Sequence, residues 1–151
     1  MLQVEETIDA LIKRLREACI KRREIEFAYL FGSHARGTAN KLSDVDVAIF
    51  LDESRIPPAG PYGYKSELLV SMRQQLRLPV DIVILNEASL ALRFRVIREG
   101  KILFCRDNRT RGGFQEKTMR DYLDFRPAAG IQRQYLLKRL SAGGFGGGQG
   151  G

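Results

Sequence analysis

Two aspartates near the middle of the chain carry the chemistry that this sequence suggests. Asp44 and Asp46 flank Val45 at the start of an apolar run that ends at Leu51. Because side chains alternate between the two faces of a strand, both carboxylates point to the same face. Two carboxylates this close repel each other unless a cation lies between them, and Mg²⁺ prefers such oxygen ligands. The pair therefore predicts a magnesium site.

The turn before the aspartates suits a phosphate. Gly32 follows the apolar stretch 25–31 directly, and a residue without Cβ lets the backbone bend sharply and a ligand approach it. Ser33 is expected to cap a short helix that begins at His34, and helix N-termini attract anions. Arg36 either reaches a triphosphate with its guanidinium or lies in solvent. A phosphate-binding turn beside metal-binding carboxylates is the arrangement that nucleotidyl transfer requires.

A third acid, Asp81, interrupts the apolar stretch 78–85. A buried carboxylate is costly unless it is paired, so Asp81 meets an arginine, caps a strand end or binds a metal. The only histidine, His34, lies beside the expected phosphate site. We interpret it as a loop residue and not as a general base, because metal-assisted nucleotidyl transfer requires no histidine.

The spacing of these residues resembles a known signature. Gly32-Ser33, ten further residues and Asp44-x-Asp46 resemble the motif of the DNA polymerase β-like nucleotidyltransferases. The longer stretch GSHARGTANKLSDVDVAIF is similar to the minimal nucleotidyltransferase antitoxins that are encoded beside HEPN-type toxins. The resemblance implies a mixed sheet flanked by helices, with a C-terminal helical extension.

The same resemblance implies ligands and roles. Mg²⁺-ATP would bind with its phosphates at Gly32 and Ser33, assisted by Arg36. The carboxylates expected to bind the metal and act in catalysis are Asp44, Asp46 and Asp81. AMP would pass from ATP to a tyrosine of a HEPN ribonuclease toxin, with which the protein would form a hetero-oligomer.

Two other functions stay open at this point. One is an antitoxin that neutralises its toxin by binding alone, although acids on apolar strands would then serve no purpose. The other is transfer of a nucleotide to a small molecule such as an aminoglycoside, for which no separate acceptor domain is evident.

Composition narrows the possible partners. The 151 residues carry a net charge of +7, but lysine and arginine are scattered along the chain and form no aromatic-and-basic segment. We therefore expect no direct nucleic-acid binding. No apolar run approaches the roughly 20 residues that cross a bilayer, and no signal peptide is evident, so a cytoplasmic protein is expected. Cys19 and Cys105 are expected to be buried thiols.

Hydrophobic periodicity and turn residues predict an α/β fold. Asn86 is expected to cap the third helix, and Gly100 to close it. Residues 52–63, with three prolines, form either a connector or a lid over the nucleotide, and we favour the connector. The expected helices are 4–22, 64–76 and 87–98, and the expected strands are 25–31, 45–51, 78–85 and 101–105.

The C-terminal third is predicted to be a separate helical part. Residues 106–113 should break regular structure, and a helix should follow from Phe114 to about Leu140, interrupted at Pro127 and Gly130. Its apolar residues either pack on the domain or dock a partner. The predicted organisation is a nucleotidyltransferase core at 1–108, a helical extension at 109–140 and a disordered glycine-rich tail at 141–151.

Overall fold

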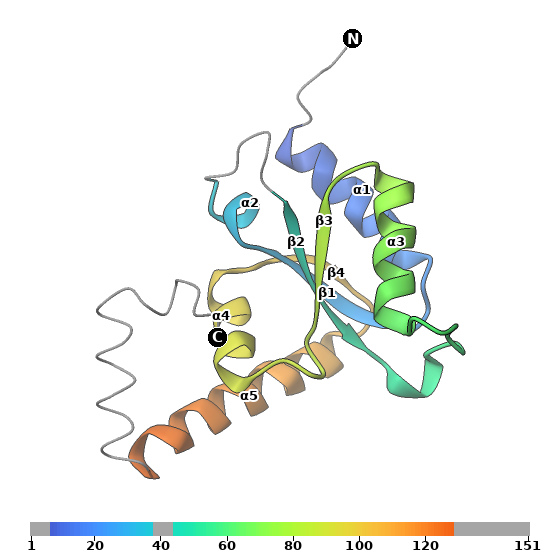
Figure 1. Cartoon of the computed structure of the whole chain (residues 1–151). Coiled ribbons are helices and arrows are strands. Elements are labelled where there is room, and N and C mark those ends of the chain that lie inside the picture. Colours follow the sequence, from blue (N-terminus) through green and yellow to red (C-terminus); the bar gives the residue numbers. More distant parts are fainter. Residues whose placement is uncertain (1–6, 38–43, 129–151) are drawn as a thin grey trace.

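The computed structural model describes residues 7–37 and 44–128 as a four-stranded sheet with helices on both faces (Figure 1). The expected α/β class, a mixed sheet flanked by helices, is confirmed. The elements in chain order are α1 (Ile8–Ile20), β1 (Ile25–Phe31), α2 (Ser33–Arg36), β2 (Val45–Leu51), η1 (Glu53–Arg55), α3 (Tyr64–Leu76), β3 (Val80–Ile84), α4 (Leu90–Glu99), β4 (Lys101–Cys105) and α5 (Asn108–Ala128).

Strand β1 organises the sheet, whose strand order is β3-β2-β1-β4. It pairs antiparallel with both β2 and β4, whereas β2 pairs parallel with β3. The end of β1 therefore lies beside the starts of its two neighbours. Phe31 lies opposite Asp46 of β2, and Leu30 lies opposite Lys101 of β4.

Alternating side chains of β1 build two cores, one on each face of the sheet. Ala28 and Leu30 belong to the core beneath α1 and α3, and Phe27 and Tyr29 belong to the core beneath α4 and α5 (Figure 1). The apolar residues of β2 that were expected to point away from Asp46 all lie in the first core: Val45, Val47 and Ile49.

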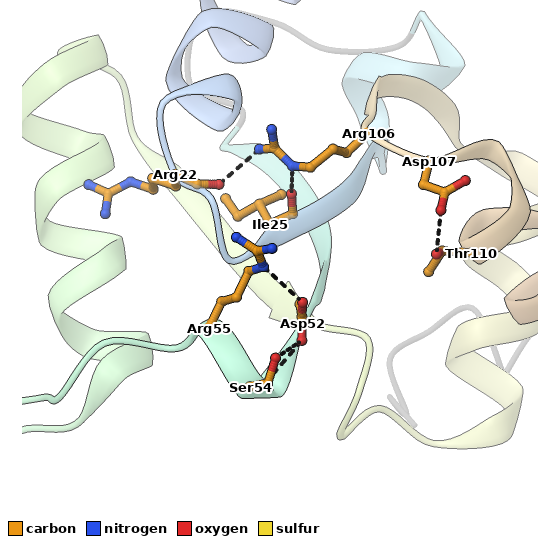
Figure 2. Close-up of polar contacts among 8 residues, drawn as sticks. All are labelled: Arg22, Ile25, Asp52, Ser54, Arg55, Arg106, Asp107 and Thr110. Carbon is orange, nitrogen blue, oxygen red and sulfur yellow. Dashed lines mark hydrogen bonds and ion pairs between the residues drawn. The ribbon is translucent and has the colours of Figure 1, made fainter.

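Helix α1 is shorter than the 4–22 predicted from periodicity. Thr7 has an extended backbone, and its hydroxyl accepts the N–H of Ala10 at 3.1 Å, so the helix begins at Ile8. Val4 lies outside the described residues. Beyond Ile20 the chain turns toward β1, and the Arg106 side chain donates hydrogen bonds of 3.1 Å to the carbonyls of Arg22 and Ile25 (Figure 2).

The connection 52–63 is mainly a loop, as expected, with one short helical turn, η1. Asp52 begins that turn: its Oδ1 accepts the Ser54 N–H at 3.0 Å, and its Oδ2 lies 3.2 Å from Arg55 Nε (Figure 2). The hydrogen bonds from Ser54 hold the pKa of Asp52 below its ordinary value. The loop follows the end of β2, whereas Asp46 lies near its start, which favours the connector over the lid.

Asn86 joins β2 to the chain after β3, so the prediction that it caps α4 is wrong. Its Oδ1 accepts the Leu51 N–H at 2.8 Å, and its Nδ2 donates to the Leu51 carbonyl at 2.9 Å. Helix α4 begins instead after Ser89, whose hydroxyl accepts the Leu92 N–H at 3.1 Å. Gly100 ends α4 as expected.

The predicted break at 106–113 is confirmed only for residues 106 and 107, because α5 begins at Asn108. Asp107 supplies the cap that the sequence reading overlooked. Its Oδ1 accepts the Arg109 N–H at 2.9 Å, and its Oδ2 accepts the Thr110 hydroxyl at 3.4 Å (Figure 2). An aspartate at this position satisfies N–H groups that have no partner within the helix.

Helix α5 continues through Gly112 and Gly113 because tertiary packing holds it. Each glycine costs about 1 kcal/mol relative to alanine in a helix interior. The ring of the next residue, Phe114, is buried, with its centroid 5.4 Å from that of Phe27 and 5.2 Å from that of Phe50. Burying such a ring contributes about 1.5–3 kcal/mol.

At its other end α5 includes Pro127, the site of an expected interruption, and stops at Ala128. A proline keeps a helical φ and removes only one hydrogen bond, which is tolerable in a last turn. Gly130 lies outside the described residues. Helix α5 packs on α4 and β1. The division into a core at 1–108, an extension at 109–140 and a tail at 141–151 stays a prediction.

The two cysteines are free thiols. Cys19 is buried as expected, and burial raises the pKa of its thiol to about 12. Cys105 is half-buried, and its Sγ donates to Asn108 Oδ1 at 3.3 Å. Among the described residues, no helix is long and apolar enough to span a membrane.

The role of Asn86 can be tested by equilibrium unfolding in urea. We expect Asn86→Ala to lower the unfolding free energy by about 2 kcal/mol, because it removes both hydrogen bonds to the Leu51 backbone. Gln75→Ala, on the exposed side of α3, is the control and should change it by less than about 0.5 kcal/mol. Equal effects of the two substitutions would contradict this role.

Candidate active site

The chain bends sharply where β1 ends. Gly32 has a φ of 77° and precedes α2, and Gly37 ends that single turn with the same φ. Gly32 itself occupies the cap position, and Ser33 is the first helical residue. The prediction that Ser33 caps a helix beginning at His34 is therefore wrong, since the backbone reverses one residue earlier than the serine.

The carboxylate of Asp46 lies directly against the backbone of Gly32. A Cβ added to Gly32 would lie 2.3 Å from Asp46 Oδ2 and 3.1 Å from its Cγ. The cause is the register of β1 and β2, in which Phe31 and Asp46 face each other one residue before the bend. Both the positive φ and the missing side chain of Gly32 are thus required here.

The other two aspartates lie at the same end of the sheet. Asp44 is exposed and immediately precedes β2, whose first residue, Val45, donates its N–H to the Pro79 carbonyl at 2.8 Å. Asp81 occupies the position on β3 that pairs with Asp46 on β2. Residues in register on parallel strands point to the same face, so β2 and β3 bring Asp46 and Asp81 side by side.

The negative charges of the aspartates at this end of the sheet repel one another. The pKa of Asp46 is raised by burial first, and then by the negative charges of Asp81 and Asp44. The positive charges of His34 and Arg36 on α2 oppose that rise. The predicted site residues are therefore near enough for their charges to interact. The conflict among the three acids is of the kind that a bound cation relieves.

The donor set fits Mg²⁺ in its chemistry, since all three candidates are carboxylates on adjoining segments. Within residues 7–37 and 44–128, however, no three His, Cys, Asp or Glu side chains are arranged as a metal-binding group. One reason for this absence is that the Asp81 carboxylate is engaged in another contact: its Oδ1 accepts the Ile82 N–H at 3.0 Å. The Asp81 side chain is exposed. The metal-binding roles of these aspartates stay predictions.

Helix α2 carries a histidine and an arginine next to the acids. His34 is half-buried, and in the described part of the chain its Nδ1 is buried without a hydrogen-bond partner. Arg36 is 46% exposed, and its Nη1 lies 3.9 Å from Glu99 Oε1. The sequence reading missed Glu99, because nothing in its local context marks a glutamate at the exposed end of a helix.

A groove of about 650 Å³ lies elsewhere, at the far end of β2. Its walls include Phe50 of β2, Asp52 directly after β2, Arg93 of α4 and Phe114 of α5. None of the predicted site residues lines it. Arg93 donates hydrogen bonds to the carbonyls of Leu85 and Asn86, in the turn before α4.

Comparison with known proteins agrees with this geometry. Residues 13–109 match the family described as polymerase beta, nucleotidyltransferase. The chain is also 33% identical over 94 residues to the protein adenylyltransferase MntA of Shewanella oneidensis, a match that covers 62% of each chain. The aligned part thus spans less than two thirds of that relative.

Three solved structures with a similar fold are of toxin–antitoxin systems. A toxin–antitoxin with AMP-PNP superposes with a TM-score of 0.66 at 24% identity, covering 86% of this chain and 98% of that one. A variant of the MntA–HpeT pair gives a TM-score of 0.61 at 27% identity, with coverages of 92% and 99%. A third structure is an MNT antitoxin with the tri-AMPylated HEPN toxin of Shewanella oneidensis; it gives a TM-score of 0.57 at 24% identity, with coverages of 89% and 95%.

The resemblance to the minimal nucleotidyltransferase antitoxins is therefore confirmed, and so is the fold that it implied. The family match extends from the middle of α1 to the start of α5 and includes the bend at Gly32 and the three aspartates. The chain belongs to the polymerase β nucleotidyltransferase family.

Proposed function

We propose that this chain is a magnesium-dependent protein adenylyltransferase antitoxin, which transfers AMP from ATP to a tyrosine of a cognate HEPN ribonuclease toxin. The observation that carries the proposal is the carboxylate of Asp46 seated against Gly32 and paired in register with Asp81. Two similar proteins support a HEPN toxin as the acceptor of AMP: one is a protein adenylyltransferase, and another is an antitoxin bound to an AMPylated HEPN toxin.

In this proposal the bend at Gly32 and Ser33 receives the phosphates of ATP. The backbone bends there at Gly32, and Arg36, the last residue of the helical turn that follows, would attract the negative charge of the phosphates. Asp44 and Asp46 would hold the nucleotide-bound Mg²⁺, with Asp81 completing the set. When bound, the metal neutralises phosphate charge and orients the reacting oxygens.

The transfer itself is a displacement at the α-phosphorus. A bond forms between the acceptor oxygen and phosphorus, the bond from phosphorus to the pyrophosphate oxygen breaks, and pyrophosphate leaves. Asp81 is the group proposed to accept the proton of the acceptor hydroxyl. Asp81 and Asp44 are both exposed, so a large acceptor such as a folded protein has access to this edge.

The cellular setting follows from the same chemistry. ATP and Mg²⁺ are cytoplasmic reagents, and the two cysteines of the chain are free thiols, as is usual in a reducing compartment. We therefore place the reaction in the cytoplasm, with the toxin as hetero-oligomeric partner.

The substitution Asp46→Asn should lower the rate of AMP transfer without lowering the stability of the protein. With labelled ATP, Mg²⁺ and the co-encoded partner, we expect transfer to fall by on the order of a hundredfold or more. Asp124→Asn, exposed on α5, is the control and should transfer normally. A tight complex in which the wild-type protein leaves the partner unlabelled would favour inhibition by binding alone, and label only on an added aminoglycoside would favour a small-molecule acceptor.

The same variant should be more stable than the wild type at neutral pH without metal. The folded-state pKa of Asp46 is raised, so its contribution to stability is present at acid pH and lost as pH rises through that pKa. Asparagine removes the ionised group, and Tm at pH 7 should increase. Added Mg²⁺ should then raise Tm of the wild type alone. A lower Tm for Asp46→Asn would contradict this electrostatic account.

Gly32→Ala and Gly37→Ala form a matched pair. Both glycines have a φ of 77°, but an added Cβ collides with Asp46 only at Gly32 and meets nothing within 4 Å at Gly37. Each substitution should cost about 1 kcal/mol or more in unfolding free energy from backbone strain. Only Gly32→Ala should also lower AMP transfer, by about a hundredfold, because it displaces the carboxylate. Equal transfer rates would contradict the role of this contact.

A further inference from the structure

The carboxylate of Glu99 lies between two arginines near the predicted nucleotide site. Its Oε1 is 3.9 Å from Arg36 Nη1 and 3.7 Å from Arg95 Nε. Arg36 is the last residue of α2 and Glu99 the last of α4, so the ion pair joins two elements that the chain places far apart. The side chains of Arg36 and Glu99 are 46% and 44% exposed, so an entering ligand has access to both.

The fold fixes the position of Glu99 through the next residue, Gly100. The Gly100 N–H donates to the Val96 carbonyl at 2.8 Å, which closes α4. A Cβ on Gly100 would lie 2.6 Å from the Val96 carbonyl oxygen and 3.2 Å from that of Leu30. Lys101 then pairs with Leu30, just before the bend at Gly32. The end of α4 is thus anchored beside the phosphate site.

Helix stability does not account for a glutamate at this place. The C-terminus of a helix carries partial negative charge, which disfavours a carboxylate there. The pair with Arg95 has the arginine on the N-terminal side, which is the less favourable order for residues four apart. The favourable partner outside α4 is Arg36.

Arg36 has two acidic groups within its influence. It ends the helical turn that begins directly after Gly32, and the carboxylate of Asp46 lies against Gly32. Helix α2 is a single turn that ends at Gly37, and so gives little support to a long side chain. An arginine that closed onto Asp46 would occupy the carboxylate proposed for the metal, whereas in this structure Arg36 Nη1 lies 3.9 Å from Glu99 Oε1.

We infer that Glu99 is a positioning residue, whose carboxylate holds the Arg36 guanidinium toward the incoming phosphates and away from Asp46. This role rests on the proposed function, since it concerns the same nucleotide site. It makes Glu99 part of nucleotide recognition although it lies on a different helix from the glycine–serine bend.

The test measures binding of a non-hydrolysable ATP analogue by calorimetry, together with KM and kcat for AMP transfer. For Glu99→Gln, we expect the dissociation constant and KM for ATP to rise about two- to fivefold, with kcat nearly unchanged. The Mg²⁺ concentration for half-maximal activity should also rise. Glu99→Asp should lie between the variant and the wild type. In an Arg36→Ala background, Glu99→Gln should have no further effect, because the partner is gone.

Glu116→Gln is the matched control, since it removes one negative charge from an exposed position of α5 and should leave both constants unchanged. Unchanged analogue binding by Glu99→Gln, or an equal loss in the Arg36→Ala background, would overturn the role of Glu99 while leaving the proposed function intact. A wild-type protein that binds no analogue and transfers no AMP would overturn the proposed function and this role with it.

Discussion

The close approach of a carboxylate to the main chain is the constraint on which the site depends. Asp46 Oδ2 occupies the space that any side chain at Gly32 would need. The antiparallel register of β1 and β2 enforces this, because it places Phe31 opposite Asp46 immediately before the bend. A slip of one residue would turn Asp46 toward the opposite core and bring Val45 or Val47 to the phosphate side.

The same arrangement concentrates negative charge, which opposes folding. Parallel pairing of β2 with β3 brings Asp81 next to Asp46, and Asp44 precedes them at the strand start. Burial raises the pKa of Asp46, and the charges of Asp81 and Asp44 raise it further. The two apolar cores on either face of the sheet stabilise the strands that carry these acids. Local instability at a functional site is usual when a protein is adapted to bind a ligand there.

The sequence predicted those features that depend on neighbours along the chain. Apolar runs of residues identified β1 and β2, and the spacing from Gly32 to Asp46 identified the bend and the acids. Features set by tertiary contacts were missed. Asn86 resembles a helix cap, but its amide pairs with Leu51. The glycines at 112 and 113 resemble a break, but Phe114 packs against both Phe27 and Phe50. No local pattern relates Glu99 to Arg36.

The direction of the strands gives the sheet two ends, which differ in how far the sequence of their loops can vary. Asp46, Asp81 and Lys101 each stand at or next to the first residue of their strands, and β1 terminates at that same end. The connections after β2 and β3 emerge at the opposite end, beyond the reach of the acids. Insertions or deletions there would leave the reacting groups in place, so related chains are free to diverge in those loops without altering their chemistry.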